Sequence, residues 1–453
     1  MWLLILLTIL NAAMGYKESL NVYRITVGGL PINVIDILMF LGLAMTPFWL
    51  RRSSQWGKHP LFGVAMVLCL VSLVGGTIMG VVAVAQNDID LRQLITFTRN
   101  FAAIPIGMLI GYSVLTHYRS TRTFAYVAVL AGCVTATMIL RFFMGRAQDF
   151  GVGSSLDSLR TVDYVQMYAG SAAGLLVASV LLGARMFPPL IALGLAGYCV
   201  VGNFSSLSRS DWIATFGAIL AIFTCVPRDK VMLRAFQGLF AMLALAVALG
   251  VGLEVASRVT GQDFHAKMTQ RLRSLLPGYQ AGVKLKSWDT RLIGAQREIE
   301  EGLKSPLIGR GFGFQDSPDM ADAVAFGTRH NSWTNAFVET GLVGLVTVIV
   351  VVGGCIVVGR RIVMARTDAG TLLIGAMAMV TGVYYALLGV MTGAFNHQRG
   401  GLHIGLTLGL VLRARMMQQS LVQEYAGYVD FADNAEGGEL PLAAVDATED
   451  RYY

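Results

Sequence analysis

The feature that most constrains this chain is a series of apolar runs of the length that crosses a lipid bilayer. A membrane-spanning helix needs ~20 mostly apolar residues, and such runs recur from the first residues to beyond residue 400. They cover residues 2–15, 32–50, 61–85, 95–115, 124–142, 165–184, 188–205, 211–227, 231–256, 331–358, 369–393 and 401–415. The sequence therefore predicts an all-α, polytopic membrane protein of about twelve transmembrane helices.

Composition supports this class and excludes others. Of the 453 residues, 55% are hydrophobic and only 14% are charged, which is too little charge to cover a soluble surface. The formal net charge of +7 comes from short basic clusters between apolar runs, a pattern typical of cytoplasmic turns rather than of nucleic-acid binding. All five cysteines lie inside apolar runs without paired spacing, so neither a disulfide nor a metal site is indicated.

The basic clusters also predict the topology, because Lys and Arg gather in turns that face the cytoplasm. The clusters are Arg51, Arg52 and Lys58; Arg119 and Arg122; Arg185; Arg228, Lys230 and Arg234; Arg360, Arg361 and Arg366; and Arg413 and Arg415. With both chain ends in the cytoplasm, we expect nine helices in residues 1–256 and one large periplasmic loop at 257–330. Three helices follow in 331–415, and the acidic tail 416–453 is predicted to be disordered.

A histidine marks the junction between the large loop and the tenth apolar run. His330 is followed by Asn331 and Ser332, both good N-caps for a helix. At ~100° per residue, Gly341 and Gly344 fall within about 40° of the direction of His330. Glycines at this spacing let another helix approach closely, and the helix start suits a phosphate group. The alternative is an interfacial histidine above glycines that only pack.

This segment resembles the histidine motif of the O-antigen ligase and Wzy-type O-antigen and exopolysaccharide polymerase family. The matching pattern is His330-Asn331, nine residues, Gly341, two residues, Gly344. The resemblance implies a bacterial inner-membrane enzyme that transfers a glycan from an undecaprenyl-diphosphate carrier to a sugar hydroxyl, with its active site facing the periplasm. It implies His330 as a catalytic residue, Asn331 beside it as a substrate-binding residue, no cofactor, and a polysaccharide chain-length regulator as a partner.

Four arginines on the outer side are further candidates, because charges at a membrane boundary need a partner or a task. Arg209, in Ser-Arg-Ser-Asp, resembles the family's serine-arginine motif, which faces the carrier diphosphate; an ion pair with Asp211 is the alternative. Arg291 opens a predicted amphipathic helix over 289–303 and is assigned a catalytic role by resemblance. Arg160 and Arg399 are assigned to substrate binding.

Two histidines compete with His330 as the base. His397 and His403 lie near the last outer turn, but neither carries the motif. No outward cluster of Asp, Glu and His with ligand spacing is present in the sequence, which favours a metal-independent, inverting transfer. An unperturbed histidine can take a hydroxyl proton near neutral pH, and guanidinium groups suit a diphosphate.

Two members of the same family, and one unrelated class, remain as alternatives. A polymerase is favoured because Arg291 and Gly302 have the spacing of a loop motif of the polymerases, and because the outer loop is basic, with eleven Lys or Arg against eight Asp or Glu. The alternative is an O-antigen ligase that attaches the glycan to lipid A core. A lipid-linked glycan transporter is more distant, since transporters place charges at mid-span.

Overall fold

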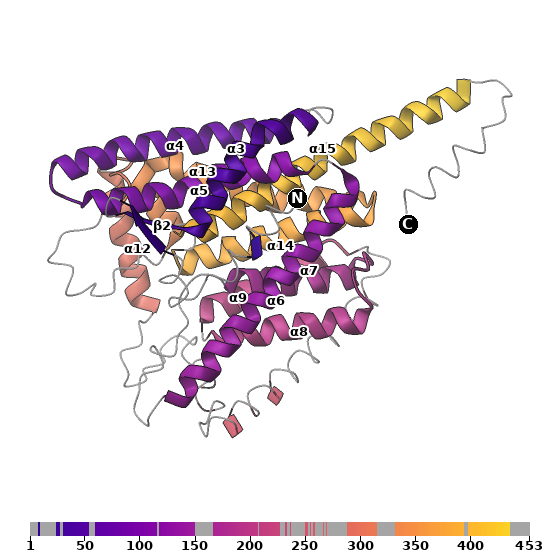
Figure 1. Ribbon diagram of the computed structural model, residues 1–453, viewed down its shortest axis with the longest axis horizontal. Coiled ribbons are helices and arrows are strands. Elements are labelled where there is room, and N and C mark those ends of the chain that lie inside the picture. Colours follow the sequence, from indigo (N-terminus) through magenta and orange to yellow (C-terminus); the bar gives the residue numbers. More distant parts are fainter. Residues whose placement is uncertain are drawn as a thin grey trace.

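The computed structural model is dominated by helices (Figure 1). It describes residues 24–27, 30–53, 59–115, 117–149, 166–206, 208–226, 288–314, 331–393 and 397–434, with isolated positions before residue 10 and between 232 and 269. The elements are β1 (Arg24–Val27), β2 (Leu30–Asn33), α3 (Val34–Ser53), α4 (Pro60–Ala85), α5 (Leu91–Val114), α6 (Tyr118–Asp149), α7 (Gln166–Leu181), α8 (Pro189–Ser205), α9 (Arg209–Phe223), α12 (Trp288–Leu303), α13 (Ser332–Ala365), α14 (Ala369–Met391) and α15 (Gln398–Asn434).

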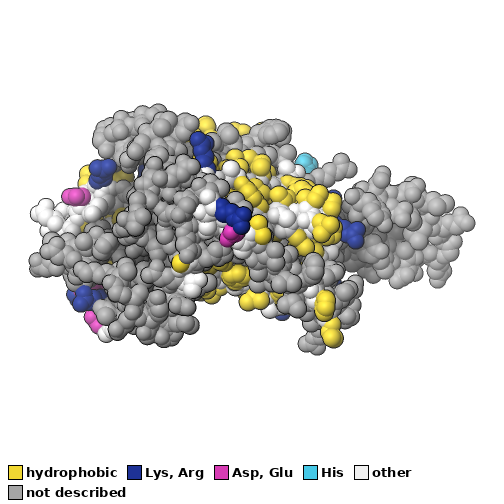
Figure 2. All heavy atoms as spheres, turned by 90° about the horizontal axis from the view of Figure 1, so that it is seen from below, with side chains coloured by type: hydrophobic (Ala, Val, Ile, Leu, Met, Phe, Trp, Pro, Cys, Tyr) yellow, Lys and Arg dark blue, Asp and Glu magenta, His cyan; other side chains and the backbone are white. Residues whose placement is uncertain are grey.

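The described residues include six helices that are long and apolar enough to cross a membrane: α3, α4, α5, α6, α13 and α14. α7 and α8 are apolar but shorter. Apolar side chains are exposed along these helices, for example Val64, Val67 and Val74 on α4, and Figure 2 shows apolar side chains gathered over the described part of one face. Exposed apolar surface on this scale marks contact with lipid, so the all-α polytopic class is confirmed.

The helices form two groups that α14 joins. α3, α4, α5, α13 and α15 lie together, α6 to α9 form a second set, and α14 packs against α13 and α15 as well as α6, α7 and α9 (Figure 1). The buried side chains Tyr384 and Tyr385 lie at this join on α14. The protein therefore has one continuous interior rather than two independent bundles.

Glycines bring α5 and α15 into backbone contact. A methyl group on Gly405 would collide with the carbonyl oxygen of Ile104, and one on Gly409 would collide with that of Met108. From the other side, a methyl group on Gly107 would lie 2.8 Å from the carbonyl oxygen of Leu402. Small residues allow this approach in lipid, where van der Waals packing replaces the hydrophobic effect between helices. The contacts advance in parallel, so α5 and α15 begin at the same end of the bundle.

Three details differ from the sequence-based expectations. Arg24–Val27 and Leu30–Asn33 form an antiparallel hairpin where a loop was expected. α15 continues to Asn434, although a disordered tail was predicted from residue 416. Good helix formers such as Met416 and Gln418 extend the helix before the acidic composition dominates. The expected spans at 2–15 and 231–256 lie almost entirely outside the described residues, so a total of twelve stays a prediction.

We predict that Gly405→Val destabilises the protein, because the added side chain would force α5 and α15 apart. Overpacking of a tight contact typically costs about 1–3 kcal/mol, which should lower the melting temperature of the detergent-solubilised protein by several degrees. Gly353→Val is the matched control, since a methyl group on Gly353 meets nothing within 4 Å. Equal melting temperatures for the two variants would contradict the proposed role of Gly405.

Candidate functional site

The helix that follows His330 has a well-defined start. Asn331 is the N-cap of α13, and its side-chain oxygen accepts hydrogen bonds from the backbone N–H groups of Trp333 at 2.9 Å and Thr334 at 3.3 Å. The hydroxyl of Ser332 donates to the carbonyl of Thr392 at the end of α14, at 2.7 Å. Helix starts leave N–H groups without intrahelical partners, and Asn331 satisfies two of them. This contact gives Asn331 a structural role besides the predicted binding role.

Three turns further on, α13 is broken at Gly341. Its backbone angles, φ 65° and ψ −157°, belong to a region that only glycine adopts readily. In an unbroken helix the N–H of Leu342 would donate to the carbonyl of Val338. Here the N–H of Leu342 donates to the carbonyl of Pro306 at 2.7 Å, and the carbonyl of Val338 accepts from the N–H of Arg310 at 2.7 Å. One helical hydrogen bond is thus replaced by two bonds to residues 306–310.

We call residues 304–314, between α12 and the described start of α13, the inserted segment. The N–H of Gly311 donates to the carbonyl of Glu339 at 3.0 Å, and that of Phe312 donates to the carbonyl of Gly76 on α4 at 3.0 Å. The Phe312 side chain is 1% exposed and contacts the Phe101 ring, with centroids 5.2 Å apart. The segment therefore passes between α4 and α13 and fills the break.

Three glycines allow the backbone of the inserted segment to adopt its conformation. Gly309, Gly311 and Gly313 all have positive φ, at 73°, 100° and 81°, a region in which a side chain is strained. A methyl group on Gly311 would also collide with the backbone of Gly80 on α4. The sequence predicted that the glycines of α13 admit a neighbouring helix. The structure shows instead that Gly341 admits the inserted segment, because its free backbone groups need partners inside the membrane.

The amphipathic helix predicted over 289–303 is present as α12, and it packs on the first turns of α13. Thr334 donates a hydrogen bond to the carboxylate of Glu298, and the Phe337 ring lies against Gly302. Arg291 belongs to the first turn of α12. It precedes Glu298 by seven residues, about two helical turns, and so shares its face of the helix. The structure therefore brings the helix that carries Arg291 to the helix that follows His330.

Arg209 lies at the start of α9, half-buried, directly after the N-cap residue Ser208. Asp211, the ion-pair partner considered for Arg209, is 6% exposed, and its carboxylate accepts a hydrogen bond from the hydroxyl of Tyr384 on α14. This bond connects the start of α9 to the C-terminal half of α14. Because α14 ends at the start of α13, Arg209 and Asn331 lie at the same end of the bundle.

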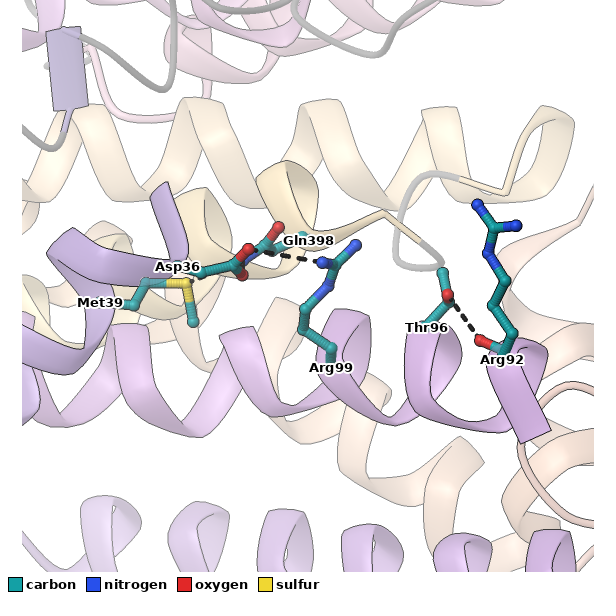
Figure 3. Close-up of polar contacts among 6 residues, drawn as sticks. All are labelled: Asp36, Met39, Arg92, Thr96, Arg99 and Gln398. Carbon is teal, nitrogen blue, oxygen red and sulfur yellow. Dashed lines mark hydrogen bonds and ion pairs between the residues drawn. The ribbon is translucent and has the colours of Figure 1, made fainter. Parts of the chain in front are cut away.

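Arg399 lies in the first turn of α15. The preceding residue, Gln398, belongs to a polar cluster that the sequence did not predict (Figure 3). Gln398 donates to one carboxylate oxygen of Asp36 at 2.5 Å, and Arg99 on α5 approaches the other at 3.4 Å. Asp36 is 5% exposed and Gln398 7%. An arginine within an apolar run is costly unless it has a partner or a task, and this signal could have singled out Arg99.

The two competing histidines have surroundings that disfavour them as bases. His403 is buried, its Nδ1 lies 3.3 Å from the hydroxyl of Tyr385, and its ring packs on Tyr168 with centroids 4.3 Å apart. His397 keeps part of its surface exposed, yet desolvation, with a smaller contribution from Arg399, lowers its pKa to about 3. A base is most effective when its pKa lies near the working pH, so His397 is poorly suited.

His330 and Arg160 lie outside the described residues, so their predicted roles stay predictions. Among the residues that the structure describes, no group of three or more His, Cys, Asp or Glu side chains could hold a metal ion. Arg209, Asn331 and Arg399 share one end of the bundle with the first turns of α5 and α12. The candidate site is therefore the end of the bundle where α13 begins, which carries several arginines; we call this end the mouth.

The fold and this mouth define a polytopic membrane protein with a polar site at one membrane surface. The family model for the O-antigen ligase domain matches residues 192–349, which include Arg209, Arg291, the inserted segment and His330. The exopolysaccharide production protein ExoQ of Rhizobium meliloti (strain 1021) is 26% identical over 237 residues. The match covers 42% of this chain and 54% of ExoQ, so the chain spans about half the length of that relative. These two matches confirm the resemblance to the O-antigen ligase and polymerase family that the sequence predicted.

We predict that Gly341→Ala displaces the inserted segment. The substitution strains the backbone, and its methyl group would collide with Leu307. Strain of this kind costs of order 1–3 kcal/mol. Hydrogen-deuterium exchange of the N–H groups of Arg310 and Gly311 should rise by tenfold or more. Gly353→Ala, in the same helix, is the control and should leave the exchange unchanged; the same result for Gly341→Ala would refute the anchoring role.

Substitutions of Asn331 separate its two roles. Asn331→Asp keeps an oxygen that caps α13, whereas Asn331→Ala loses the cap at a cost of about 1 kcal/mol. If the side-chain N–H₂ group also binds substrate, Asn331→Asp should keep the melting temperature of the wild type but lose polymer formation. Normal polymer formation by Asn331→Asp, with a lower melting temperature for Asn331→Ala, would limit Asn331 to the cap.

Proposed function

We propose that this protein is an inner-membrane glycosyltransferase that moves a glycan from an undecaprenyl-diphosphate carrier to a sugar hydroxyl. The observation that carries the proposal is the assembly, inside and beside the matched region, of Arg209, α12 with Arg291, and the capped start of α13. His330 directly precedes that start. Residues 257–330 are proposed as the periplasmic loop that completes the site, and 331–415 as the helices that support it.

The proposed chemistry needs one base and several cations. His330 takes the proton from the acceptor hydroxyl, whose oxygen attacks the anomeric carbon of the glycan as the bond from that carbon to the diphosphate oxygen breaks. Attack from the face opposite the leaving group inverts the anomeric configuration. Arg209 and Arg291 neutralise the diphosphate as it leaves, because a guanidinium binds phosphate through paired hydrogen bonds and stays charged. Arg160 and Arg399 bind substrate nearby, and no metal is needed in this scheme.

Charge at the opposite end of the bundle supports the proposed orientation. Arg366 donates to the carbonyl of Cys225 at 3.2 Å, and Arg122 donates to that of Arg185 at 3.1 Å. Arg361 and Arg415 lie near His59 at the start of α4 and help to lower its pKa, after the larger effect of burial. Clustered Arg and Lys favour the cytoplasm. The mouth with Arg209 and Asn331 then faces the periplasm.

A polymerase is the favoured form of the activity. The relative's name refers to exopolysaccharide production, which agrees with the Arg291 to Gly302 spacing. The glycan on one carrier would then be transferred to a second carrier-linked glycan, and a chain-length regulator is the expected partner. The second form is an O-antigen ligase with lipid A core as the acceptor, which the domain description favours. Both use the same base and arginines.

His330→Ala should abolish transfer while the protein still accumulates in the membrane. Loss of a general base costs about 10²–10⁴-fold in rate. Arg209→Lys should fail nearly as badly as Arg209→Ala, because lysine keeps the charge but loses the two-pronged contact. Polymer is measured in a deletion strain that expresses each variant, with His117→Ala, an exposed histidine at the opposite end, as control. Near-normal polymer from His330→Ala would exclude His330 as the base.

Deletion of the gene distinguishes polymerase from ligase. Carrier-linked glycans extracted from the deletion strain are separated by gel and identified by mass spectrometry. A polymerase leaves single repeat units on the carrier. Long chains that remain on the carrier, with lipid A core unsubstituted, would identify a ligase and overturn the favoured form.

A further inference from the structure

Two arginines line one face of α5 at the same end of the bundle as the candidate site. Arg92 lies in the first turn and is exposed, while Arg99 lies seven residues later with 30% of its side chain exposed. Seven residues are about two turns, or ~10 Å along the axis, and return to within ~20° of the same direction. Figure 3 shows both side chains rising from the same side of α5, with Thr96 between them.

The positions of these arginines are costly for α5 itself. Asp90 and Gln93 form a capping box that fixes the start of the helix, and a cation in the first turn is unfavourable to the positive end of the helix dipole. Arg99 lies deeper, inside an apolar run, where a charge is more expensive still. Asp36 offsets part of the cost at Arg99. An anion bound between or above the two guanidinium groups would offset the cost at Arg92 and add a second contact for Arg99.

The surrounding helices hold Arg99 in place. Asp36 on α3 pairs with Arg99 and accepts a hydrogen bond from Gln398 on α15, so three helices meet at the Asp36 carboxylate. The backbone contact of α5 with α15 fixes their spacing, since a methyl group on Gly401 would lie 3.0 Å from the carbonyl oxygen of Asn100. The cluster is therefore a built and rigid feature rather than a pair of loose surface charges.

The location points to a ligand of the outer membrane surface. Gln398, which bonds to the partner of Arg99, directly precedes Arg399 in the chain. The row of Arg92 and Arg99 on α5 therefore lies next to the start of α15, which carries Arg399 at the mouth. Arg92 is at the level of the turn after α4, and Arg99 is two turns deeper, while α3 beside it exposes Ile37, Phe40 and Leu41. An amphiphile could place its apolar chain against the exposed side chains of α3 and its phosphate groups against the two arginines of α5.

We propose that Arg92 and Arg99 form a second diphosphate-binding site, which receives the head group of a prenyl-diphosphate glycan from the outer leaflet. The proposal rests on the proposed function and adds a site outside residues 192–349. Phosphate oxygens accept hydrogen bonds from both guanidinium groups, with the Thr96 hydroxyl on the same face. Arg399 then links this site to the mouth where Arg209 and Asn331 lie.

The test measures binding of farnesyl diphosphate, which has the same head group on a short prenyl chain. Full-length protein is placed in phosphatidylcholine nanodiscs, and the affinity is measured for the wild type, Arg92→Gln and Arg99→Gln. Each variant should bind about tenfold more weakly, since charge-assisted hydrogen bonds are the stronger ones. Arg258→Gln is the control for a lost charge, because Arg258 is exposed and pairs with Glu254 at 2.7 Å.

Arg99→Gln leaves Asp36 buried without its cation, which destabilises a protein. The double variant Asp36→Asn with Arg99→Gln removes both charges and keeps the test valid if the single variant does not fold. Arg92→Gln changes an exposed side chain and provides an independent measurement. Its affinity should fall as well.

The same measurement in nanodiscs that contain phosphatidylglycerol separates the carrier from ordinary anionic lipid. Unchanged affinity for farnesyl diphosphate in both Arg92→Gln and Arg99→Gln would overturn the proposal, as would a loss that affects only the retention of phosphatidylglycerol. In either case wild-type binding of farnesyl diphosphate leaves the proposed function standing. If the wild type itself does not bind farnesyl diphosphate, the proposed carrier and the second site both fall.

Discussion

The break in α13 is the interaction on which the rest of this site depends. A backbone group inside a membrane must find a partner within the protein, and Gly341 leaves groups on both sides of the break without a helical one. The inserted segment supplies them from Pro306, Arg310 and Gly311. Since the segment also binds Gly76 on α4, it fixes the start of α13, the end of α12 and the C-terminal half of α4 relative to one another. The candidate site therefore lies on a rigid part of the bundle.

The same logic explains why glycines occupy so many of the contacts that matter. Helices that meet in lipid gain stability from close packing, and α5 and α15 approach to backbone contact along several turns. That approach brings Gln398 and Arg99 to Asp36. Polar residues at this end of the bundle are therefore held by the apolar packing of the helices that carry them.

The sequence predicted the class of the protein, the amphipathic helix before the histidine, and a cap at Asn331 or Ser332, of which the structure shows Asn331. These depend on local patterns: length of apolar runs, helical periodicity and the chemistry of a helix start. It did not predict the hairpin before α3, the helical continuation to Asn434, or the polar cluster around Arg99. The cluster joins residues 36, 99 and 398, and no local pattern connects positions so far apart in the chain.

What the sequence by itself determined is therefore the membrane class, the family resemblance, and the residue types that the proposed chemistry uses, because each depends on a contiguous stretch. Only the tertiary structure decided whether Gly341 packs against another helix or breaks α13. Its spacing from Gly344 is equally suited to helix packing and to a break, and the choice follows from the distant inserted segment, whose backbone groups complete those of α13. The tertiary structure likewise decided that His403 is enclosed by Tyr168 and Tyr385, since burial depends on which helices pack together rather than on the neighbours of a residue in the chain.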